Sequence, residues 1–547
     1  MVLRLPRSGI STTTHGIKSK LQRRWNLPFI YIVKYQNIMS NSENNKRIAK
    51  NTLMLYIRML FTMGVSLFTS RVILQALGVE DYGVYSVVGG IITMFSFING
   101  GMVSATQRYL TFEIGKGNLL QLKKVFSTSL QIHALIALIV VILGETIGLW
   151  FLYEKMVIPA DRMTAAFWVY QCSIVASVVS IMSVPYNADI IAHEKMSAFA
   201  YISILDVVLK LAIVYILYIS PWDKLITYAV LILSIQLAIR YVYTRYCNKH
   251  FEETHYHHQL DKSLFKEMFT FAGWSFLGNL AGVLYSQGLN MMLNIFYGPV
   301  VNAARGIAVQ VQTAVQGFVG NFQMALNPQI TKNYAAGQLM QMHNLMFRSA
   351  KFSFFLLFFL TLPILLETEY ILTIWLQNVP TDTVIFTQWM IGISLIYCIA
   401  NPCVIANQAT GEVKVYQAVV GGILLLIVPI SYIVLSLGAP AYSVFIVHFC
   451  VESMAQLSRM MMLRKLIKLP LYAYFQHIYG PIILVVFVSC LLPIYVHYML
   501  PYGIVRFLLV GVSCVVSVGA SAFTLGLTKS EKSFFYNKVL SLLRIKQ

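Results

Sequence analysis

The chain has very few charged residues for its length. Only 11% of its 547 residues are Asp, Glu, Lys or Arg, whereas soluble proteins contain about 25%. Hydrophobic residues make up 58%, and the mean hydropathy is +0.68. A water-soluble fold of this size would lack the charge needed to cover its surface. The apolar excess must face lipid, which excludes a soluble globular protein and predicts a polytopic membrane protein.

Other absences exclude several kinds of chemistry. The phosphate-binding motif Gly-x-x-x-x-Gly-Lys-Ser/Thr does not occur, so the chain has no built-in ATPase of that type. The seven Cys show no Cys-x-x-Cys spacing and predict free, buried thiols, with neither a disulfide framework nor a zinc site. We therefore expect no cofactor and no metal.

Apolar runs of membrane-spanning length recur along the whole chain. A helix needs about 20 residues to cross the hydrocarbon core. The weakest candidates, 164–188, 301–327 and 440–463, are rich in polar residues, so twelve or thirteen spans remain open alternatives. The predicted spans are 52–77, 83–108, 129–152, 164–188, 198–219, 224–245, 268–296, 301–327, 348–372, 384–407, 415–437, 440–463, 480–499 and 504–526.

The net charge of +20 is explained by topology. Lys and Arg accumulate in cytoplasmic loops of membrane proteins. If both termini are cytoplasmic, nearly all loop Lys and Arg fall inside, and the outer loops hold only Lys155, Arg162 and Lys224. The alternation supports fourteen spans and requires no nucleic-acid partner. No outer loop exceeds about 17 residues, which disfavours an enzyme such as a polysaccharide polymerase or ligase.

The first 38 residues differ from the rest of the chain. They are basic, and their apolar stretch 27–33 is too short to span a membrane. They also lack a small-residue cleavage motif, so we predict no signal peptide. Our hypothesis is that translation starts at Met39, with a genuine cytoplasmic tail as the alternative.

An internal repeat divides the predicted spans. At an offset of about 220 residues, Gly117 aligns with Gly337, and Pro185 aligns with Pro402 at 217. Each unit would hold six spans, so both units would have the same orientation and share a cavity between them. The predicted fold is all-α, with about fourteen transmembrane helices in two parallel six-helix lobes plus two extra helices. The predicted parts are a basic tail (1–50), an N-lobe with spans 1–6 (51–246), a linker (247–267), a C-lobe with spans 7–12 (268–464), a loop (465–479), spans 13–14 (480–526) and a basic tail (527–547).

Polar side chains form stripes on the first two helices of each unit. At 100° per residue, the polar residues of span 8 fall within about 80° of one another. Isolated amides usually hold helices together, but a stripe that includes an Arg predicts a hydrated cavity. Spans 3, 9, 11, 13 and 14 are nearly featureless and are predicted to face lipid or to support the others. The stripes include Arg58, Thr62, Ser66 and Thr69 on span 1, Asn279, Gln287, Asn290 and Asn294 on span 7, and Asn302, Arg305, Gln312, Gln316, Gln323 and Asn327 on span 8.

Arg58 and Arg305 are the candidate contacts for an anionic ligand. Neither has an acid three or four residues away in its own helix, and Arg favours anions. The alternatives are a pairing with an acid on another helix, or snorkelling to the membrane surface. Arg71 and Arg506 lie near helix ends and are predicted to snorkel or anchor.

Three intramembrane residues, Asp206, His448 and Glu452, are candidates for binding a coupling proton or cation. His448 and Glu452 are four residues apart on one face of span 12, a spacing that suits a proton or cation site or a structural hydrogen bond. Asp206 precedes Lys210 by one turn, which predicts an ion pair within the helix. The histidines of the linker, His255, His257 and His258, are predicted to lie in a solvated loop rather than at a metal.

The opening of the apolar region resembles a known family. The helix end SRVILQALGVEDYGVY (70–85), followed by a helix rich in Gly and Ser, is similar to the start of bacterial polysaccharide flippases of the Wzx type. These flippases belong to the multidrug/oligosaccharidyl-lipid/polysaccharide exporter superfamily. The stretches PYNADIIAHEKM (185–196) and NPCVIANQATGEV (401–413) resemble two helix ends of that family. The resemblance covers about 50–465, and its motifs identify a superfamily better than a substrate.

The resemblance implies a function and a location. Such proteins carry an undecaprenyl-pyrophosphate-linked oligosaccharide, for O-antigen, capsule or exopolysaccharide, to the outer leaflet of the bacterial inner membrane. A lipid-linked oligosaccharide and the lipid bilayer are then the expected partners, with a glycan polymerase and export machinery as candidate protein partners. Arg58 and Arg305 would neutralise the pyrophosphate. The residues expected to bind sugar hydroxyls are Asn290, Asn294, Gln312, Gln316 and Gln323.

Two alternatives share this fold. A cation-coupled multidrug exporter would be expected to line its cavity with acids, whereas the stripes here are neutral or cationic. A lipid II flippase of peptidoglycan synthesis would have the same number of spans, but the opening motif is more similar to the capsule and O-antigen branch.

Overall fold

The computed structural model describes most of the chain from 47 to 533. It leaves out 67, 70–71, 74–75, 78–80, 82–83, 86–87, 89–96, 155–157, 256–260, 377–378 and 530, and the side chains of 97–100, 294, 299–300 and 303. The chain divides into two units, Met1–Leu53 and Met54–Gln547, and every helix from α3 onward belongs to the second. Predictions that lie outside the described residues or side chains concern Met39 and the segment before it, Arg71, Asn294, His257, His258 and the C-terminal tail from 534.

Helices form all the regular structure in the described residues. Residues 47–66 are helical, and the later elements run through the remaining predicted spans. Their bounds are α3 Phe97–Lys116, α4 Leu119–Leu143, η1 Gly144–Gly148, α5 Leu149–Glu154, η2 Ala160–Arg162, α6 Met163–Ala192, α7 Met196–Ile219, α8 Lys224–His250, η3 Glu252–Thr254, α9 Lys262–Tyr297, α10 Pro299–Ala335, α11 Leu339–Leu366, α12 Thr368–Leu376, α13 Thr383–Thr410, α14 Val413–Leu425, α15 Ile427–Ser436, α16 Ser443–Leu466, α17 Leu471–Tyr474, η4 Phe475–Tyr479, α18 Gly480–Met499, α19 Ile504–Ser521 and η5 Ala522–Gly526.

Nine helical segments of the described chain are long and apolar enough to cross a membrane. They coincide with nine of the predicted spans. The predicted spans that do not meet this criterion include 268–296, 301–327 and 440–463, which lie in α9, α10 and α16. These helices are less apolar because they carry polar side chains toward the protein interior rather than toward lipid. The chain is an all-α polytopic membrane protein, as the sequence predicts.

Several helices extend well beyond the predicted spans. α3 continues to Lys116 and α10 to Ala335, and the next helices begin after short turns. Gly117 and Gly337, which align in the repeat, lie in these turns, and both have a φ of 72°. The left-handed conformation favours glycine. Hydropathy identifies only the segment of a helix that crosses lipid, so it places the helix ends too early.

Arg108 and Arg459 lie at the inner ends of predicted spans 83–108 and 440–463, where the charge pattern counts them among the cytoplasmic cations, but both are buried within helices. Arg108 lies in α3 with 9% of its surface exposed, and Arg459 lies in α16 with 3% exposed. Both helices continue past the predicted span ends, to Lys116 and Leu466, so the two positions lie within helices rather than at their ends. Neither arginine is therefore an exposed loop charge of the kind that the positive-inside rule counts.

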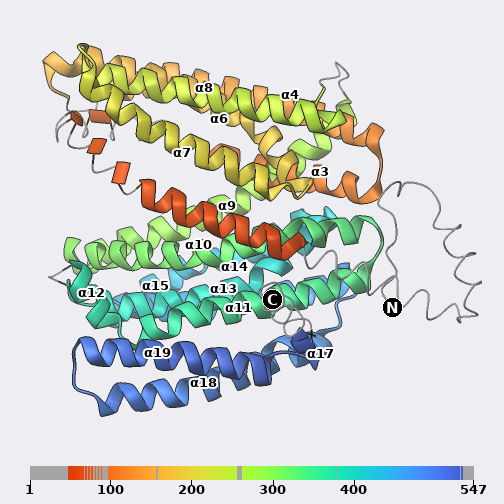
Figure 1. The fold of residues 1–547 in the computed structure, drawn as a ribbon, viewed down its shortest axis with the longest axis vertical. Coiled ribbons are helices and arrows are strands. Elements are labelled where there is room, and N and C mark those ends of the chain that lie inside the picture. The colour runs from red at the N-terminus through yellow and green to blue at the C-terminus, as the bar shows by residue number, and fades with distance from the viewer. Residues whose placement is uncertain are drawn as a thin grey trace, which may run out of the picture. The chain divides into compact units, whose positions relative to one another are not determined.

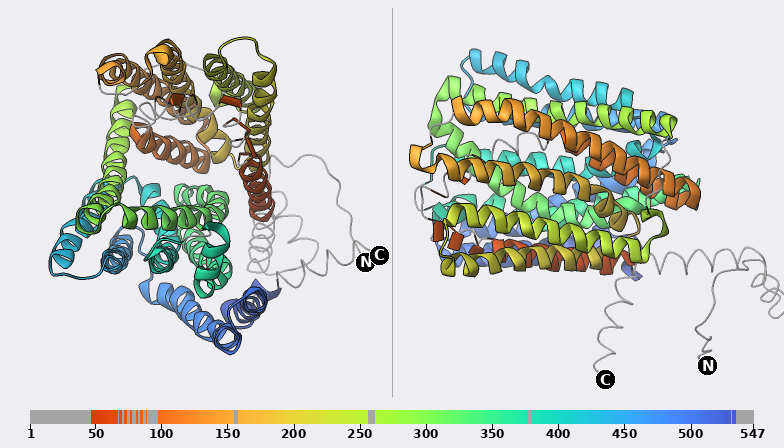
Figure 2. Two further views of the ribbon diagram at one scale, coloured as in Figure 1. Left: turned by 90° about the vertical axis from the view of Figure 1, so that its left-hand side faces the viewer. Right: turned by 90° about the horizontal axis from the view of Figure 1, so that it is seen from above.

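Helices on either side of the linker are joined by α9. Met102 of α3 and Phe126 of α4 belong to the same buried cluster as Met268 and Phe271 from the first half of α9. The second half of α9 packs instead with α10, α13, α15 and α16 in a different buried cluster. The long helices run alongside one another in all the views (Figures 1 and 2). We call the basic end the end of this bundle where α3, α6, α10 and α13 finish and the next helices begin.

The last two helices pack against each other and against α11 (Figure 1). At one end they are held by Glu367, which is buried next to α12. The Nδ1 atom of His497 lies 2.8 Å from Glu367 Oε1, and Arg506 Nη2 donates to Glu367 Oε2 at 3.0 Å. Arg506, which is predicted to snorkel or anchor, thus pairs with Glu367 between α11 and α12.

Candidate functional site

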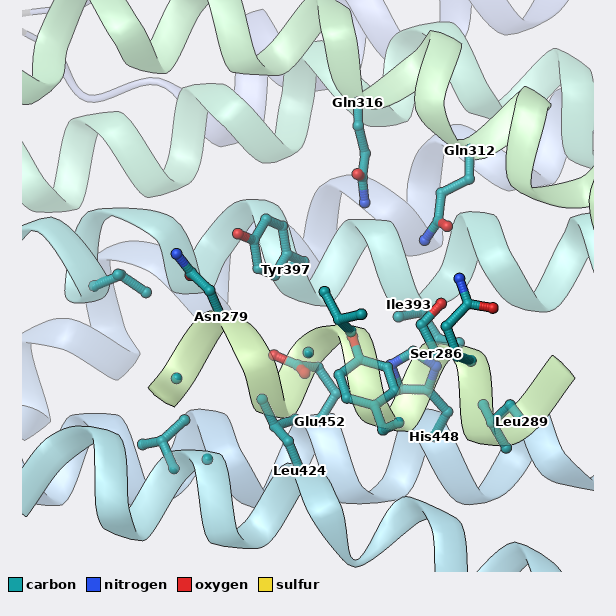
Figure 3. Close-up of a pocket in the computed structure, with 18 of the residues that line it drawn as sticks. Asn279, Ser286, Leu289, Gln312, Gln316, Ile393, Tyr397, Leu424, His448 and Glu452 are labelled. Carbon is teal, nitrogen blue, oxygen red and sulfur yellow. The ribbon is translucent and has the colours of Figure 1, made fainter. Parts of the chain in front are cut away.

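A cavity of about 560 Å³ lies among α9, α10, α13, α14 and α16. Its size falls in the range of about 300–1,000 Å³ that is typical of small-molecule sites. Gln312 and Gln316 point into it from α10, while His448 and Glu452 lie across the space from them (Figure 3). The polar lining comprises Asn279, Tyr285, Ser286, Gln287, Arg305, Gln312, Gln316, Tyr397, Gln408, Tyr416, Gln417, His448, Glu452 and Arg459.

Glycines on α9 let α14 approach closely at one wall. Gly278 and Gly282 are one turn apart and both line the cavity, as does Gly421 of α14. A Cβ at Gly278 would overlap the side-chain amide of Gln417. Small residues at this spacing allow membrane helices to pack backbone to backbone. The sequence Gly-Asn-Leu-Ala-Gly therefore positions Gln417 in the cavity.

Arg305 is the cationic group of the cavity that lacks an acidic partner in the described part of the chain. Its Nη2 donates to the carbonyl oxygen and the hydroxyl of Ser286, at 3.0 and 3.2 Å, and its Nη1 donates to Asn290 Oδ1 at 3.4 Å. Its Nε is buried without a hydrogen-bond partner, and only 8% of the residue is exposed. A buried, uncompensated guanidinium is costly, and an anionic ligand would offset that cost.

The predicted amides occupy different positions. Gln312 and Gln316 line the cavity, and the Nε2 of Gln316 donates to Ser394 Oγ at 3.1 Å. Asn290 lies beside the cavity as the partner of Arg305. Gln323 is buried outside it, where it donates to Ser353 Oγ at 3.0 Å and to the Cys398 carbonyl at 2.8 Å. Gln323 therefore joins helices in this conformation, whereas Gln312 and Gln316 can meet a ligand.

Glu452 and His448 both line the cavity, but the ion-pair partner of Glu452 is Arg459. The Nη1 of Arg459 lies 2.7 Å from Glu452 Oε1, and its Nε donates to Tyr416 Oη at 3.2 Å. The two residues are seven apart on α16 and therefore share a face. The ring of His448 packs edge-on against Tyr285 at 5.1 Å. The negative charge of Glu452 is thus already compensated, while the positive charge of Arg305 is not.

Arg58 lies apart from this cavity. Its Nη2 donates to Asn321 Oδ1 at 3.0 Å, and its guanidinium stacks over Phe199 at 4.7 Å. Asn321 follows Arg305 by sixteen residues on α10, which corresponds to about 24 Å along a helix. The two arginines therefore do not meet at one phosphate group in this conformation. This differs from the sequence expectation that both neutralise the same pyrophosphate.

Asp206 also lies away from the cavity. Its Oδ2 accepts a hydrogen bond from Lys210 Nζ at 2.8 Å within α7, the ion pair that the spacing predicts. Both side chains are partly exposed. The role of Asp206 in ion coupling stays a prediction.

The sequence reasoning missed part of the lining. Span 11 reads as featureless, yet α14 contributes Tyr416 and Gln417 to the cavity. α13 contributes Tyr397 and Gln408. Gln417 is the polar residue of span 11 that faces the cavity. A single amide on an apolar helix is not enough to predict from the sequence which face of the helix is buried. Arg459 was missed because it was counted as a cytoplasmic topology charge at the end of span 12.

Comparison with known proteins gives a family and a fold. The sequence model of a family described as polysaccharide biosynthesis protein matches residues 48–334. The sequence matches no curated protein.

Solved structures share the fold at low identity. A MATE protein in a bent conformation has 12% identity and a TM-score of 0.67, covering 78% of this chain and 97% of its own. An outward-facing multidrug resistance MATE transporter of the MOP superfamily has 13% identity and a TM-score of 0.65, covering 77% and 96%. A MOP superfamily transporter from Pyrococcus furiosus, described as having a binding pocket of reverse polarity, has 14% identity and a TM-score of 0.60, with the same coverage.

Proposed function

Since the chain belongs to the polysaccharide biosynthesis protein family and has the fold of MOP transporters, we propose that it is a flippase for a lipid-linked oligosaccharide. The cargo would be an oligosaccharide on undecaprenyl pyrophosphate, destined for O-antigen, capsule or exopolysaccharide. It would move from the cytoplasmic to the outer leaflet of a bacterial inner membrane, with both termini of the protein cytoplasmic. The protein would be a transporter rather than an enzyme.

The observation that carries this proposal is Arg305 in a cavity lined with amides. Its Nε lacks a hydrogen-bond partner, and the described residues include no acid paired with it. A pyrophosphate supplies charge and acceptors for such a group. Gln312, Gln316 and Gln417 present donors and acceptors that suit sugar hydroxyls. We retain Asn290 as the residue that orients Arg305, and Asn294 and Gln323 as candidates in other conformations.

Contacts at the basic end support transport by alternating access. Glu194, in the turn after α6, accepts hydrogen bonds from Gln329 at 2.6 Å and Lys332 at 2.7 Å, both on α10. Arg108 of α3 donates to the carbonyl oxygens of Gln408 at 3.1 Å and Ala409 at 3.2 Å, at the end of α13. Both contacts join helices before the linker to helices after it. Breaking them would let the two predicted lobes separate at this end.

The experiment replaces Arg305 in a strain that depends on this gene for surface polysaccharide. Hydrogen bonds to charged groups contribute about 1.5–3 kcal/mol, a factor of about ten or more. Arg305→Ala should therefore reduce surface glycan at least about tenfold at an unchanged amount of membrane protein, with partial retention in Arg305→Lys. Lys210→Gln is the matched control, because Lys210 is paired on α7 away from the cavity. Full glycan display by Arg305→Ala would contradict the assignment.

Arg58→Ala belongs in the same experiment. If the anionic group passes Arg58 in another conformation, this variant also loses glycan display. If Arg58 only joins its helix to Asn321, the loss should be reproduced by Asn321→Ala. The comparison therefore decides whether Arg58 contacts the cargo.

A cation-coupled multidrug exporter is the second candidate function. The observation that favours it is the carboxylate of Glu452 in the cavity beside His448, although Arg459 pairs with that carboxylate. An exporter would extrude cationic dyes in a manner sensitive to Glu452→Gln and insensitive to Arg305→Ala. A flippase would show the opposite dependence for glycan display.

A further inference from the structure

A second cluster of ionisable side chains lies outside the cavity, where the end of α6 meets the linker. Asp189 lies in the last turn of α6, His193 caps that helix, and Glu253 lies in η3. His193 Nε2 is 2.5 Å from Glu253 Oε1 and 3.8 Å from Asp189 Oδ1. One ligand atom from each of the three side chains lies within 4.8 Å of the other two. The cluster thus brings together residues that are 60 positions apart in the sequence.

The cluster is buried, and the carboxylate of Asp189 has no hydrogen-bond partner in it. Asp189 is fully buried and Glu253 is 2% exposed. Neither carboxylate oxygen of Asp189 accepts a hydrogen bond. Two buried carboxylates next to one imidazole leave at least one negative charge in excess when both are ionised. A buried charge of this kind is costly unless a cation or a proton compensates it.

The aromatic ring and the thiol next to the cluster do not neutralise the charge of its carboxylates. The ring of His193 stacks on Phe251 at 4.2 Å, which holds the imidazole in place. The thiol of Cys247 donates to the Tyr186 carbonyl at 3.6 Å.

We propose that Asp189, His193 and Glu253 form a binding site for a divalent transition-metal ion, Zn²⁺ above all. One imidazole nitrogen and two carboxylate oxygens form a ligand set that Zn²⁺ accepts, with a fourth position left for water. The α6 backbone presents Asp189 and His193 one turn apart on the same face, the spacing at which helices hold pairs of metal ligands. The linker supplies the third ligand.

Sequence reasoning predicts no metal in this chain, and the reason is physical. Asp189 and His193 are part of a helix end, and Glu253 lies across the whole of α7 and α8. No local spacing motif unites the three. A bound ion would tie η3 of the linker to the end of α6, next to the turn that carries Glu194.

The first measurement uses the purified full-length protein, stripped with a chelator and titrated with zinc chloride alone. We expect one Zn²⁺ per chain, with loss of that binding in Asp189→Asn, His193→Asn and Glu253→Gln. Two controls test the location. His250→Asn removes an exposed histidine three positions before Glu253 in the sequence, and the combined change of His255, His257 and His258 to Asn removes the linker histidines. Both controls should bind one Zn²⁺.

Localisation can also be tested without altering the protein. Bound Zn²⁺ should protect His193 of the wild-type protein from histidine-modifying reagent, as read by peptide mass spectrometry, while His250 remains reactive. X-ray absorption should show nitrogen and oxygen ligands without sulfur. Absence of Zn²⁺ binding by the wild type, retention of it in Asp189→Asn, or unprotected His193 would overturn the site. The cluster would then be a pair of carboxyl groups that share a proton.

Discussion

At the scale of single residues, the arginines inside the fold differ in what compensates their charge. Arg459 and Arg506 pair with buried acids at 2.7 and 3.0 Å. Arg108 is held by two carbonyl oxygens and lies over the rings of Tyr109 and Phe112, at 4.4 and 4.7 Å. Arg305 has neither an acid nor a stacked ring in the described residues. The chemistry around each guanidinium, rather than its presence in a helix, thus distinguishes Arg305 from the other three.

Asp223 allows a prediction at the same scale. Its Oδ1 caps α8 by accepting from the amides of Leu225 and Ile226, each at 3.0 Å, and its Oδ2 lies 2.8 Å from Arg162 Nη1. Loss of such a cap costs about 1 kcal/mol. Asp223→Ala should therefore lower the melting temperature of the detergent-purified protein. Asp223→Asn keeps a capping oxygen and should lower it less. Equal melting temperatures for wild type and Asp223→Ala would exclude the capping role.

The ion pair of Asp223 adds a dependence on pH. Burial alone would raise its pKa, but hydrogen bonds from Ile226 and Arg162 outweigh this and hold the pKa below the ordinary 3.8. A carboxyl group with a lowered pKa stabilises the fold above its unfolded pKa, and this contribution is lost as the pH falls through the folded pKa. The difference in melting temperature between wild type and Asp223→Asn should be constant from about pH 5 to 8 and should shrink below about pH 4. A difference that grows on acidification would contradict this.

At the scale of elements, two glycines of α3 allow it to pack closely against α9 and α10. A Cβ at Gly101 would lie 2.5 Å from the Ala272 carbonyl oxygen of α9, and one at Gly115 would lie 2.8 Å from the Cα of Lys332 on α10. Both contacts are with backbone, which cannot move aside as a flexible side chain can. α3 therefore approaches α9 and α10 more closely than larger residues would permit.

This close approach reverses the usual effect of replacing glycine. Alanine favours a helix over glycine by about 1 kcal/mol. At Gly511 of α19, where a Cβ would meet no atom within 4 Å, Gly511→Ala should raise or preserve the melting temperature. Gly101→Ala should lower it, since the helices must separate. Calorimetry of both variants in one detergent tests the sign, and a shift of the same sign in both would contradict the close crossing.

At the scale of the whole molecule, the contacts at the basic end predict a conformational equilibrium. Glu194→Gln removes the ion pair with Lys332 and should increase the population that is open at this end. Spin labels at Lys195 and Gln338, which are both exposed, should report longer distances in the variant. Asp206→Asn removes an ion pair within one helix and should leave the distances unchanged. Identical distance distributions for wild type and Glu194→Gln would show that this contact does not restrain opening.

The sequence predicts what depends on helix periodicity. Gln312 and Gln316 fall on the face of α10 that carries Arg305, and all three line the cavity, because a helix fixes which of its residues share a face. It does not predict which helix that face meets. Gln417 enters the cavity because α14 packs against the glycines of α9, and Glu452 pairs with Arg459 rather than with His448. These pairings depend on tertiary packing, which the spacing of residues in the sequence does not reveal.

The repeat has one further consequence at the basic end. At the offset of 217 that aligns Pro185 with Pro402, Glu194 aligns with Gly411, and both are left-handed, with φ of 58° and 83°. The turn at Glu194 thus contacts α10 through a carboxylate. The turn at Gly411 has no such side chain, and the carbonyl oxygens just before it accept hydrogen bonds from Arg108. Added salt weakens the ion pair between Glu194 and Lys332. It should weaken less the contacts that Arg108 makes with carbonyl oxygens and aromatic rings. We therefore expect the two predicted halves to respond unequally to ionic strength, with the contacts of Glu194 breaking at lower salt than those of Arg108.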